Sequence, residues 1–258
     1  MPQNLKITSS GKGTPLVLIH GWGLNSGVWQ PLIPALSEKF QVITIDLPGF
    51  GINHDFILED YSIENIAKLV EQSLDEPAVI LGWSLGGLVA SQLALAFPHK
   101  VKAIISVASS PHFVANDDWA GIEPIVLKGF YKLLSEDTAK TIDNFLKIQA
   151  MGSPHIRADV KKTKELIMQY PMPNKDTLMR ALALLENVDL RAQLHRIECP
   201  FLRMYGRLDS LVPKASIENI EQLVPNSDSY VFEKASHAPF ISHEEEFSEA
   251  LITWVQNL

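Results

Sequence analysis

Short apolar runs of strand length recur along this chain. They occur at residues 15–20, 41–46, 78–82, 101–108, 200–206 and 229–233. Between them, residues 62–73 and 88–97 carry apolar side chains at the three- and four-residue spacing of a helix. Runs that are apolar on both faces are typical of a parallel sheet covered by helices. The pattern predicts an α/β fold with a mostly parallel central sheet flanked by helices.

The alternation of strand-like and helix-like runs stops between residues 111 and 187. The pattern there is wholly helical, with Pro and Gly interruptions and no convincing strand. Strand-like runs then resume, and residues 245–256 predict a closing amphipathic helix. We therefore expect a core domain formed by residues 1–110 and 188–258, with a helical cap at residues 111–187 inserted into it.

Composition and charge narrow the classes of function. The 258 residues carry a formal net charge of −8, which gives no general attraction to nucleic acid or to an anionic membrane surface. No apolar run reaches the roughly 20 residues that span a bilayer, and the N-terminal segment lacks the pattern of a signal peptide. The single cysteine, Cys199, excludes an internal disulfide. We expect a cytoplasmic protein that works as a monomer.

The candidate chemistry is concentrated at residues 82–86. Gly82-Trp83-Ser84-Leu85-Gly86 fits the pattern G-x-S-x-G between a predicted strand and a predicted helix. On such a turn the glycines let the chain pass closely, and the serine hydroxyl is lifted clear of the sheet. The pattern favours Ser84 as a nucleophile, although the same glycines could form only a packing turn.

A serine nucleophile needs a base and an acid that orients the base. Asp209 and His237 each follow a predicted strand, in the chain order serine, acid, histidine, so both lie at the same sheet edge as Ser84. We expect His237 to be the general base and Asp209 to orient it. The nearest competitors are His243, which we assign to a solvated helix start, and Asp46, to which we assign a structural role.

The segment His20-Gly21-Trp22-Gly23 follows the first clear strand. It resembles the H-G segment that supplies an oxyanion-hole donor in α/β-hydrolases, although it could be only a turn. We expect the backbone N–H groups of Trp22 and Leu85 to bind the oxyanion, and the Trp22 indole to line the pocket. The sequence has no phosphate-binding loop and no histidine cluster at metal spacing, so we expect neither a cofactor nor a metal.

Longer stretches extend the similarity to one family. The segments LGWSLGGLVA at 81–90, VASSP at 107–111 and HAPFISH at 237–243 resemble the pimeloyl-acyl-carrier-protein methyl ester esterases of biotin synthesis. FLKIQAMG at 145–152 and Asp189-Leu190-Arg191 are more particular to this family. The resemblance spans nearly the whole chain, and it implies a carboxylesterase that releases methanol and the free pimeloyl carboxylate.

The resemblance also implies which residues bind the substrate. Contacts to its chain fall on Phe145, Leu146, Lys147, Ile148 and Gln149, while Trp22, Ser84, Leu85 and His237 lie at the reacting ester. Family arginines match Lys140, Asn144 and Arg157, so this sequence has a lysine at the first of these positions and a neutral side chain at the second.

Charge is segregated along the chain. Residues 140–180 hold eight basic residues against four acidic ones, so this stretch is +4 and the remainder is −12. On a helix over residues 156–168, Ile156, Val160 and Ile167 share one face, and Arg157, Lys161 and Lys164 share another. A basic rim would steer an acidic carrier protein, so Lys140, Arg157, Lys161 and Lys164 are the expected carrier contacts. The alternative is a solvated helix face.

Two other functions remain open. One is a carboxylesterase of broad specificity that acts on small free esters. The other is a catalytically idle hydrolase fold used as a receptor or scaffold, which the intact set of Ser84, Asp209 and His237 makes the weaker alternative.

Overall fold

The computed structural model describes residues 4–258, and a seven-stranded sheet forms its centre. The strands lie in the order β1-β3-β2-β4-β5-β6-β7, and all neighbouring pairs are parallel except β1 with β3. Their bounds are Ile7–Ser10, Pro15–Ile19, Gln41–Ile45, Ala78–Trp83, Val101–Val107, Phe201–Gly206 and Asp228–Phe232 for β1 to β7. This arrangement confirms the predicted mostly parallel sheet.

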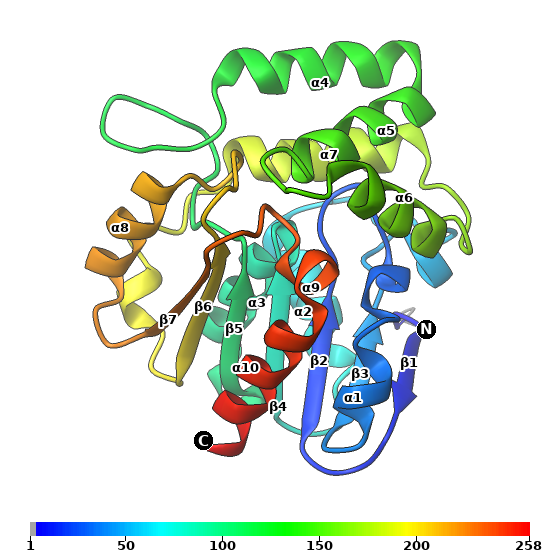
Figure 1. The fold of residues 1–258 in the computed structure, drawn as a ribbon. Coiled ribbons are helices and arrows are strands. Elements are labelled where there is room, and N and C mark those ends of the chain that lie inside the picture. The colour runs from blue at the N-terminus through cyan, green and yellow to red at the C-terminus, as the bar shows by residue number, and fades with distance from the viewer. Residues whose placement is uncertain (1–3) are drawn as a thin grey trace.

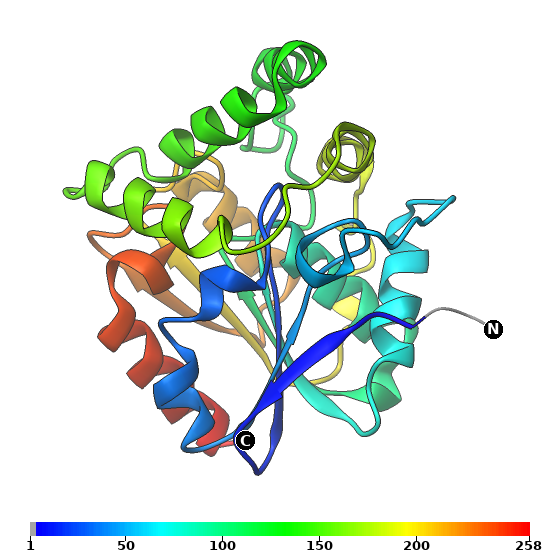
Figure 2. The same cartoon turned by 90° about the vertical axis from the view of Figure 1, so that its right-hand side faces the viewer.

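Helices cover both faces of the sheet. On one face lie α1 (Ile33–Ser37) and α10 (Glu244–Gln256), and on the other lie α2 (Ile63–Gln72) and α3 (Leu85–Ala96) (Figure 2). The α8 helix (Lys214–Leu223) follows β6, and the short α9 (Pro239–Ser242) precedes α10. The sequence of α3 is apolar almost all round, so this helix can be buried between the sheet and α2. None of the helices formed by residues 4–258 meets the length and apolarity that a membrane crossing requires.

Four helices lie over the edge at which the parallel strands end (Figure 1). They are α4 (Pro124–Glu136), α5 (Thr138–Gln149), α6 (Ile156–Ile167) and α7 (Lys175–Asn187). The chain leaves the sheet at Pro111 and returns at Leu190, whose backbone N–H donates to the Pro111 carbonyl over 2.9 Å. The two connections therefore run side by side, beneath the helices that they support.

Residues 111–123 correct the sequence prediction. They were expected to be helical, but they form a loop with isolated bridges between Val114 and Ile122 and between Asn116 and Trp119. The buried Trp119 holds this loop, because its indole donates to the His112 carbonyl over 2.8 Å. The division into a core and a cap at residues 111–187 stays a prediction, and the first three residues of the predicted core lie outside the described range.

Candidate active site

Ser84 lies on the turn between β4 and α3. Its backbone angles, φ 55° and ψ −116°, are strained for a residue with a side chain. Two bonds hold this conformation: the Ser84 N–H donates to the Val107 carbonyl over 2.9 Å, and the Ser109 hydroxyl donates to the Ser84 carbonyl over 2.7 Å. A side chain at Gly82 would collide with the backbone of Gly86. The glycines of the motif are therefore required by close backbone contact.

Asp209 and His237 form a buried pair. The Nδ1 atom of His237 lies 2.7 Å from Oδ2 of Asp209, and both side chains are withdrawn from solvent. The other carboxylate oxygen accepts the backbone N–H groups of Leu211 and Val212 over 2.8 and 3.1 Å, which fixes the carboxylate plane. Because a carboxylate only accepts hydrogen bonds, Nδ1 carries the proton and Nε2 is left as the basic atom.

The loop that carries His237 is attached to the nucleophile turn. The indole of Trp83, the residue before Ser84, donates to the His237 carbonyl over 2.8 Å, and the two rings lie 5.7 Å apart. The His237 N–H donates to the Gln149 carbonyl in α5 over 3.1 Å. Within the described residues the buried Nε2 of His237 has no hydrogen-bond partner, so its bond to the Ser84 hydroxyl is not made in this conformation. Catalytic hydrogen bonds often tighten only when substrate binds.

The segment from His20 to Trp22 passes directly beside the nucleophile. A Cβ atom placed on Gly21 would lie 3.2 Å from the Cβ of Ser84, so a side chain at this position would crowd the serine. The Trp22 indole is buried, and it donates to the Leu178 carbonyl in α7 over 3.0 Å. The structure thus places the predicted oxyanion segment at the serine, with its tryptophan reaching into the helices above.

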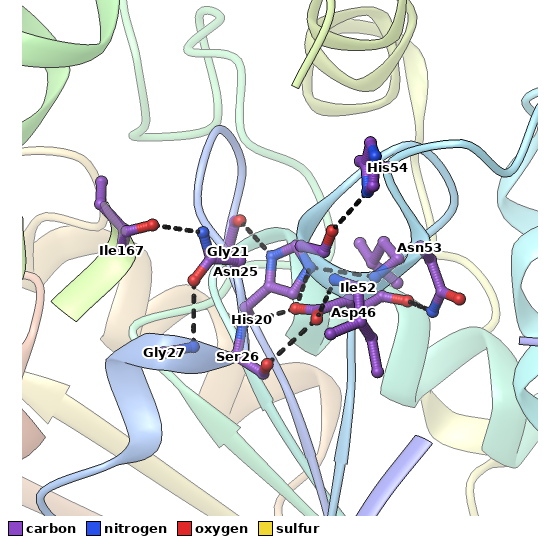
Figure 3. Close-up of polar contacts among 12 residues, drawn as sticks. His20, Gly21, Asn25, Ser26, Gly27, Asp46, Ile52, Asn53, His54 and Ile167 are labelled. Carbon is purple, nitrogen blue, oxygen red and sulfur yellow. Dashed lines mark hydrogen bonds and ion pairs between the residues drawn. The ribbon is translucent and has the colours of Figure 1, made fainter. Parts of the chain in front are cut away.

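A buried polar network supports this segment from below (Figure 3). The Nε2 atom of His20 accepts the Leu47 N–H over 3.0 Å, and its Nδ1 lies 2.8 Å from the Gly21 carbonyl, so the ring is neutral with its proton on Nδ1. Burial lowers the pKa of His20, and the nearby Asp46 carboxylate only partly offsets this effect. Asp46 accepts the N–H and the hydroxyl of Ser26 over 2.5 and 3.0 Å. These contacts agree with the structural role expected for Asp46.

The residues expected to bind the substrate chain divide into two groups. Phe145, Leu146 and Gln149 face the interior, whereas Lys147 is exposed and Ile148 is half-buried. The Phe145 ring lies 4.8 Å from the Trp22 ring, which brings α5 to the candidate site. Ser84 is only 2% exposed and His237 is fully buried, so the site is closed in this conformation.

A surface groove of about 360 Å³ lies between α4 and α5, and Lys147 and Ile148 line it. Its wall includes Phe130, whose ring lies 5.6 Å from that of Phe145 and 6.1 Å from that of Trp22. The exposed and the buried members of the predicted substrate set are thus connected by a chain of aromatic contacts.

The expected carrier contacts differ in how available their charges are. Lys140 and Arg157 are exposed, and neither forms an ion pair within the part of the chain that the structure describes. Lys161 lies 3.8 Å from Glu165, and Lys164 is bound to Asp143 over 2.8 Å. On the apolar face of α6, Ile167 is buried and Val160 is half-buried, whereas Ile156 at the start of the helix is 38% exposed.

A family model described as alpha/beta hydrolase fold matches residues 14–244. The chain belongs to the α/β-hydrolase family. Solved structures agree at the level of the fold: a bromoperoxidase from Bacillus anthracis has a TM-score of 0.88 at 21% identity, covering 97% of this chain and 94% of that chain. An esterase from Exiguobacterium antarcticum has a TM-score of 0.88 at 23% identity, covering 98% and 95%.

Two curated relatives of this α/β-hydrolase are much nearer in sequence. The pimeloyl-[acyl-carrier protein] methyl ester esterase of Aeromonas hydrophila is 48% identical over 248 residues, which cover 96% of this chain and 98% of that protein. The protein of the same name from Photobacterium profundum is 48% identical over 248 residues, covering 96% and 97%. The family resemblance inferred from the sequence is confirmed.

Two other kinds of site are relevant to this α/β-hydrolase, a metal cluster and a reactive thiol. Among residues 4–258, no group of three or more His, Cys, Asp or Glu side chains is arranged to hold a metal ion. Cys199 precedes β6 at the sheet edge opposite Ser84, and burial raises the pKa of its thiol. A thiol that stays protonated is a poor nucleophile.

Sequence reasoning missed several contacts at the site of this α/β-hydrolase. The Trp83 indole that holds the His237 loop sits at a variable position of the G-x-S-x-G pattern, and Phe130 belongs to a helix with no motif. Asn25 was also missed, although its amide bonds the Ile167 carbonyl of α6 over 3.0 Å. An Asn before a short helical turn is a recognisable N-cap signal, but its second partner is distant in sequence.

Proposed function

We propose that this chain is a serine carboxylesterase that hydrolyses the methyl ester of pimeloyl-acyl-carrier protein in biotin synthesis. The observation that carries the proposal is the 48% identity, over 96% of the chain, to two proteins named for that activity. The buried Asp209–His237 pair and the strained turn at Ser84 supply the matching chemistry. The reaction yields methanol and pimeloyl-acyl-carrier protein whose terminal carboxylate is free.

In the proposed mechanism, Nε2 of His237 takes the proton of the Ser84 hydroxyl as its oxygen attacks the ester carbonyl carbon. Asp209 keeps the imidazole in the required tautomer and stabilises its protonated form. The tetrahedral oxyanion accepts the N–H groups of Trp22 and Leu85, and losing one such donor typically costs about 2.7–4 kcal/mol in the transition state.

Collapse of this intermediate breaks the bond to the methoxy oxygen, which leaves as methanol after taking the proton from His237. Water then attacks the acyl-enzyme while His237 again serves as base, and the same steps release the carboxylate and restore Ser84. These side chains and backbone groups complete the reaction, so the proposal includes no cofactor and no metal.

The cap helices α4 to α7 are proposed to hold the substrate. Phe145, Leu146 and Gln149 would contact the acyl chain near the serine, and Lys147 and Ile148 would contact it where the α4–α5 groove reaches the surface. This assignment is supported by the aromatic contacts that connect the groove to Trp22. We also propose that residues 111–187 act as a cap on the core.

The basic side of the cap is proposed to receive the carrier protein. Acyl carrier proteins are strongly acidic, and Lys140 and Arg157 present exposed charges. Lys161 and Lys164 would contribute less, because each already forms an ion pair, with Glu165 and Asp143 respectively. The enzyme is proposed to act as a monomer in the cytoplasm, where the carrier brings its substrate.

The test compares methyl esters of short dicarboxylic acids, free and carrier-linked, with the Ser84→Ala variant as control. We expect the carrier-linked methyl ester to be preferred in kcat/KM, and Ser84→Ala to be inactive on both. Equal turnover of free and carrier-linked esters would instead identify a broad carboxylesterase. Failure of a fluorophosphonate to label Ser84 would identify an idle hydrolase fold.

A further inference from the structure

The loop beside the nucleophile, residues 22–27, is hydrogen-bonded to the cap helix α6 through Asn25. The side-chain amide uses both of its ends: Nδ2 donates to the Ile167 carbonyl at the end of α6 over 3.0 Å, and Oδ1 accepts the Gly27 N–H over 3.0 Å (Figure 3). Asn25 is 4% exposed. The buried Asn25 side chain is therefore the N-cap of the short helix η1 (Ser26–Trp29), and it also donates to a carbonyl at the C-terminal end of α6.

Further contacts bind this loop both to the core below it and to the helices above it. The Trp22 indole donates to the Leu178 carbonyl in α7. A Cβ atom on Gly27 would lie 2.5 Å from the Leu166 carbonyl oxygen, so the loop and the last turn of α6 are in direct backbone contact. From below, Asp46 holds Ser26 by two hydrogen bonds. The backbone between Trp22 and Ser26 is thus fixed on one side by the core and on the other by α6 and α7.

We propose that Asn25 is a positioning residue that makes the oxyanion hole depend on the position of α6. We call α6 seated when its last turn contacts Asn25 and Gly27, as in this structure. The inference rests on the proposed function, in which the Trp22 N–H binds the oxyanion. When α6 is seated, the buried amide of Asn25 has both partners and the loop keeps its shape. When α6 shifts, Nδ2 is left without its partner in a buried place, which is costly, and the loop has to rearrange.

The same helix carries the proposed carrier contacts at Arg157 and Lys161. A carrier protein bound to this outer face of α6 would favour the seated helix, and Asn25 would pass that preference to Trp22. The arrangement connects the arrival of the substrate's carrier with the completion of the site that stabilises the reacting ester. No contact between the carrier and the loop itself is needed.

Asn25→Asp is the sharpest test, because aspartate keeps the acceptor for the Gly27 N–H and replaces the donor to Ile167 with a charged oxygen that cannot donate. On a short p-nitrophenyl ester we expect kcat to fall about tenfold and KM to stay within about twofold, which is part of the 100- to 1,000-fold typical for losing an oxyanion donor. The affinity for a boronic acid that mimics the tetrahedral intermediate should fall in parallel with kcat/KM. Substituting a merely structural residue would not lower the boronic acid affinity and kcat/KM in parallel.

Lys162→Met is the matched control. It removes another contact between α6 and the core, the ion pair of Lys162 with Glu244 at 2.7 Å, without touching the loop. We expect its kcat on the small ester to stay within about twofold of the wild type, since half-exposed ion pairs contribute little. Gly27→Ala places a methyl group against the Leu166 carbonyl oxygen and Oδ1 of Asn25, so it should lower kcat as Asn25→Asp does.

The outcomes separate the inference from the proposed function. Wild-type kcat in Asn25→Asp and Gly27→Ala, with Ser84→Ala inactive, overturns the role of Asn25 and leaves the esterase standing. An equal loss in Lys162→Met also overturns it, because any loosening of α6 would then suffice. A wild-type protein that hydrolyses no ester overturns both. Thermal unfolding of each variant identifies a fold defect, and if Asn25→Asp is unfolded, the Gly27→Ala kinetics decide the question.

Discussion

The carboxylate of Asp209 determines which nitrogen of His237 can act as a base. Asparagine at this position would keep the oxygen that accepts the Leu211 and Val212 N–H groups, but it would turn an amide donor toward Nδ1. The proton would then move to Nε2, the atom that is proposed to accept the Ser84 proton. We expect Asp209→Asn to lower kcat by about 10⁴-fold, as the same change does in a serine protease triad.

The measurement is steady-state kinetics on a short methyl ester together with thermal unfolding. A folded variant that retains kcat within about tenfold of the wild type would rule out Asp209 as the orienting acid. Asp46→Asn offers a comparison at another buried carboxylate, one that contacts the Ser26 loop and not His237.

His20 should make the stability of the fold depend on pH. Its pKa in the folded protein lies below the ordinary value of 6.5 because the ring is buried. As the pH falls below 6.5, the unfolded chain binds a proton at this residue before the folded chain can. The free energy of unfolding therefore falls until the pH reaches the lowered pKa of the folded state, and it levels off below that point.

Urea unfolding at several pH values between about 7.5 and about 5 measures this effect, with His20→Gln as the comparison. Glutamine has no titrating group, so the variant should lose less stability over that interval than the wild type does. Parallel pH dependences in the two proteins would show that His20 makes no such contribution.

At the scale of elements, the turn between β4 and α3 has no room for another side chain at Gly82. A methyl group there would overlap the backbone of Gly86, so the turn must open to accept it. We expect Gly82→Ala to destabilise the protein by about 1–3 kcal/mol and to displace Ser84 enough to abolish ester hydrolysis.

Gly129→Ala is the matched substitution in a helix, because a Cβ atom at this position in α4 meets nothing within 4 Å. Alanine should stabilise the helix by up to about 1 kcal/mol and leave hydrolysis of a small ester unchanged. Thermal unfolding and kinetics of both variants check the pair. A Gly82→Ala protein as stable and as active as Gly129→Ala would show that the turn is looser than the structure indicates.

The elements that could be predicted from the sequence are those with a strong local signal. The buried parallel strands are continuous apolar runs, whereas β1 holds one apolar residue, Ile7, and pairs with β3 only because the folded chain brings the two together. The loop at 111–123 owes its shape to distant contacts. In the candidate site, motif and chain order picked out Ser84, Asp209 and His237 as candidates, and the structure pairs the last two. The bond between Asn25 and Ile167 joins residues 142 positions apart, which no local pattern can show.

Across the whole molecule, net charge and local charge oppose each other. The chain is −8 overall, yet residues 140–180 carry +4 and lie over the sheet edge that holds the candidate site. We therefore expect an acidic partner to be attracted mainly at residues 140–180. Such an arrangement affects the orientation of an encounter more than its final affinity.

Salt dependence tests this arrangement, because ions screen the attraction between exposed charges. We expect kcat/KM for the carrier-linked methyl ester to fall several-fold as salt rises from about 20 mM to about 200 mM, while the free ester changes little. In Arg157→Glu with Lys161→Glu, the rate at low salt should fall about tenfold and the salt dependence should flatten. The control is Lys12→Glu with Lys39→Glu, which changes the net charge equally at the β1–β2 turn and before β3, at the end of the sheet opposite the cap (Figure 1). If both double variants lose the same activity, overall charge governs the encounter and the cap has no special part in it.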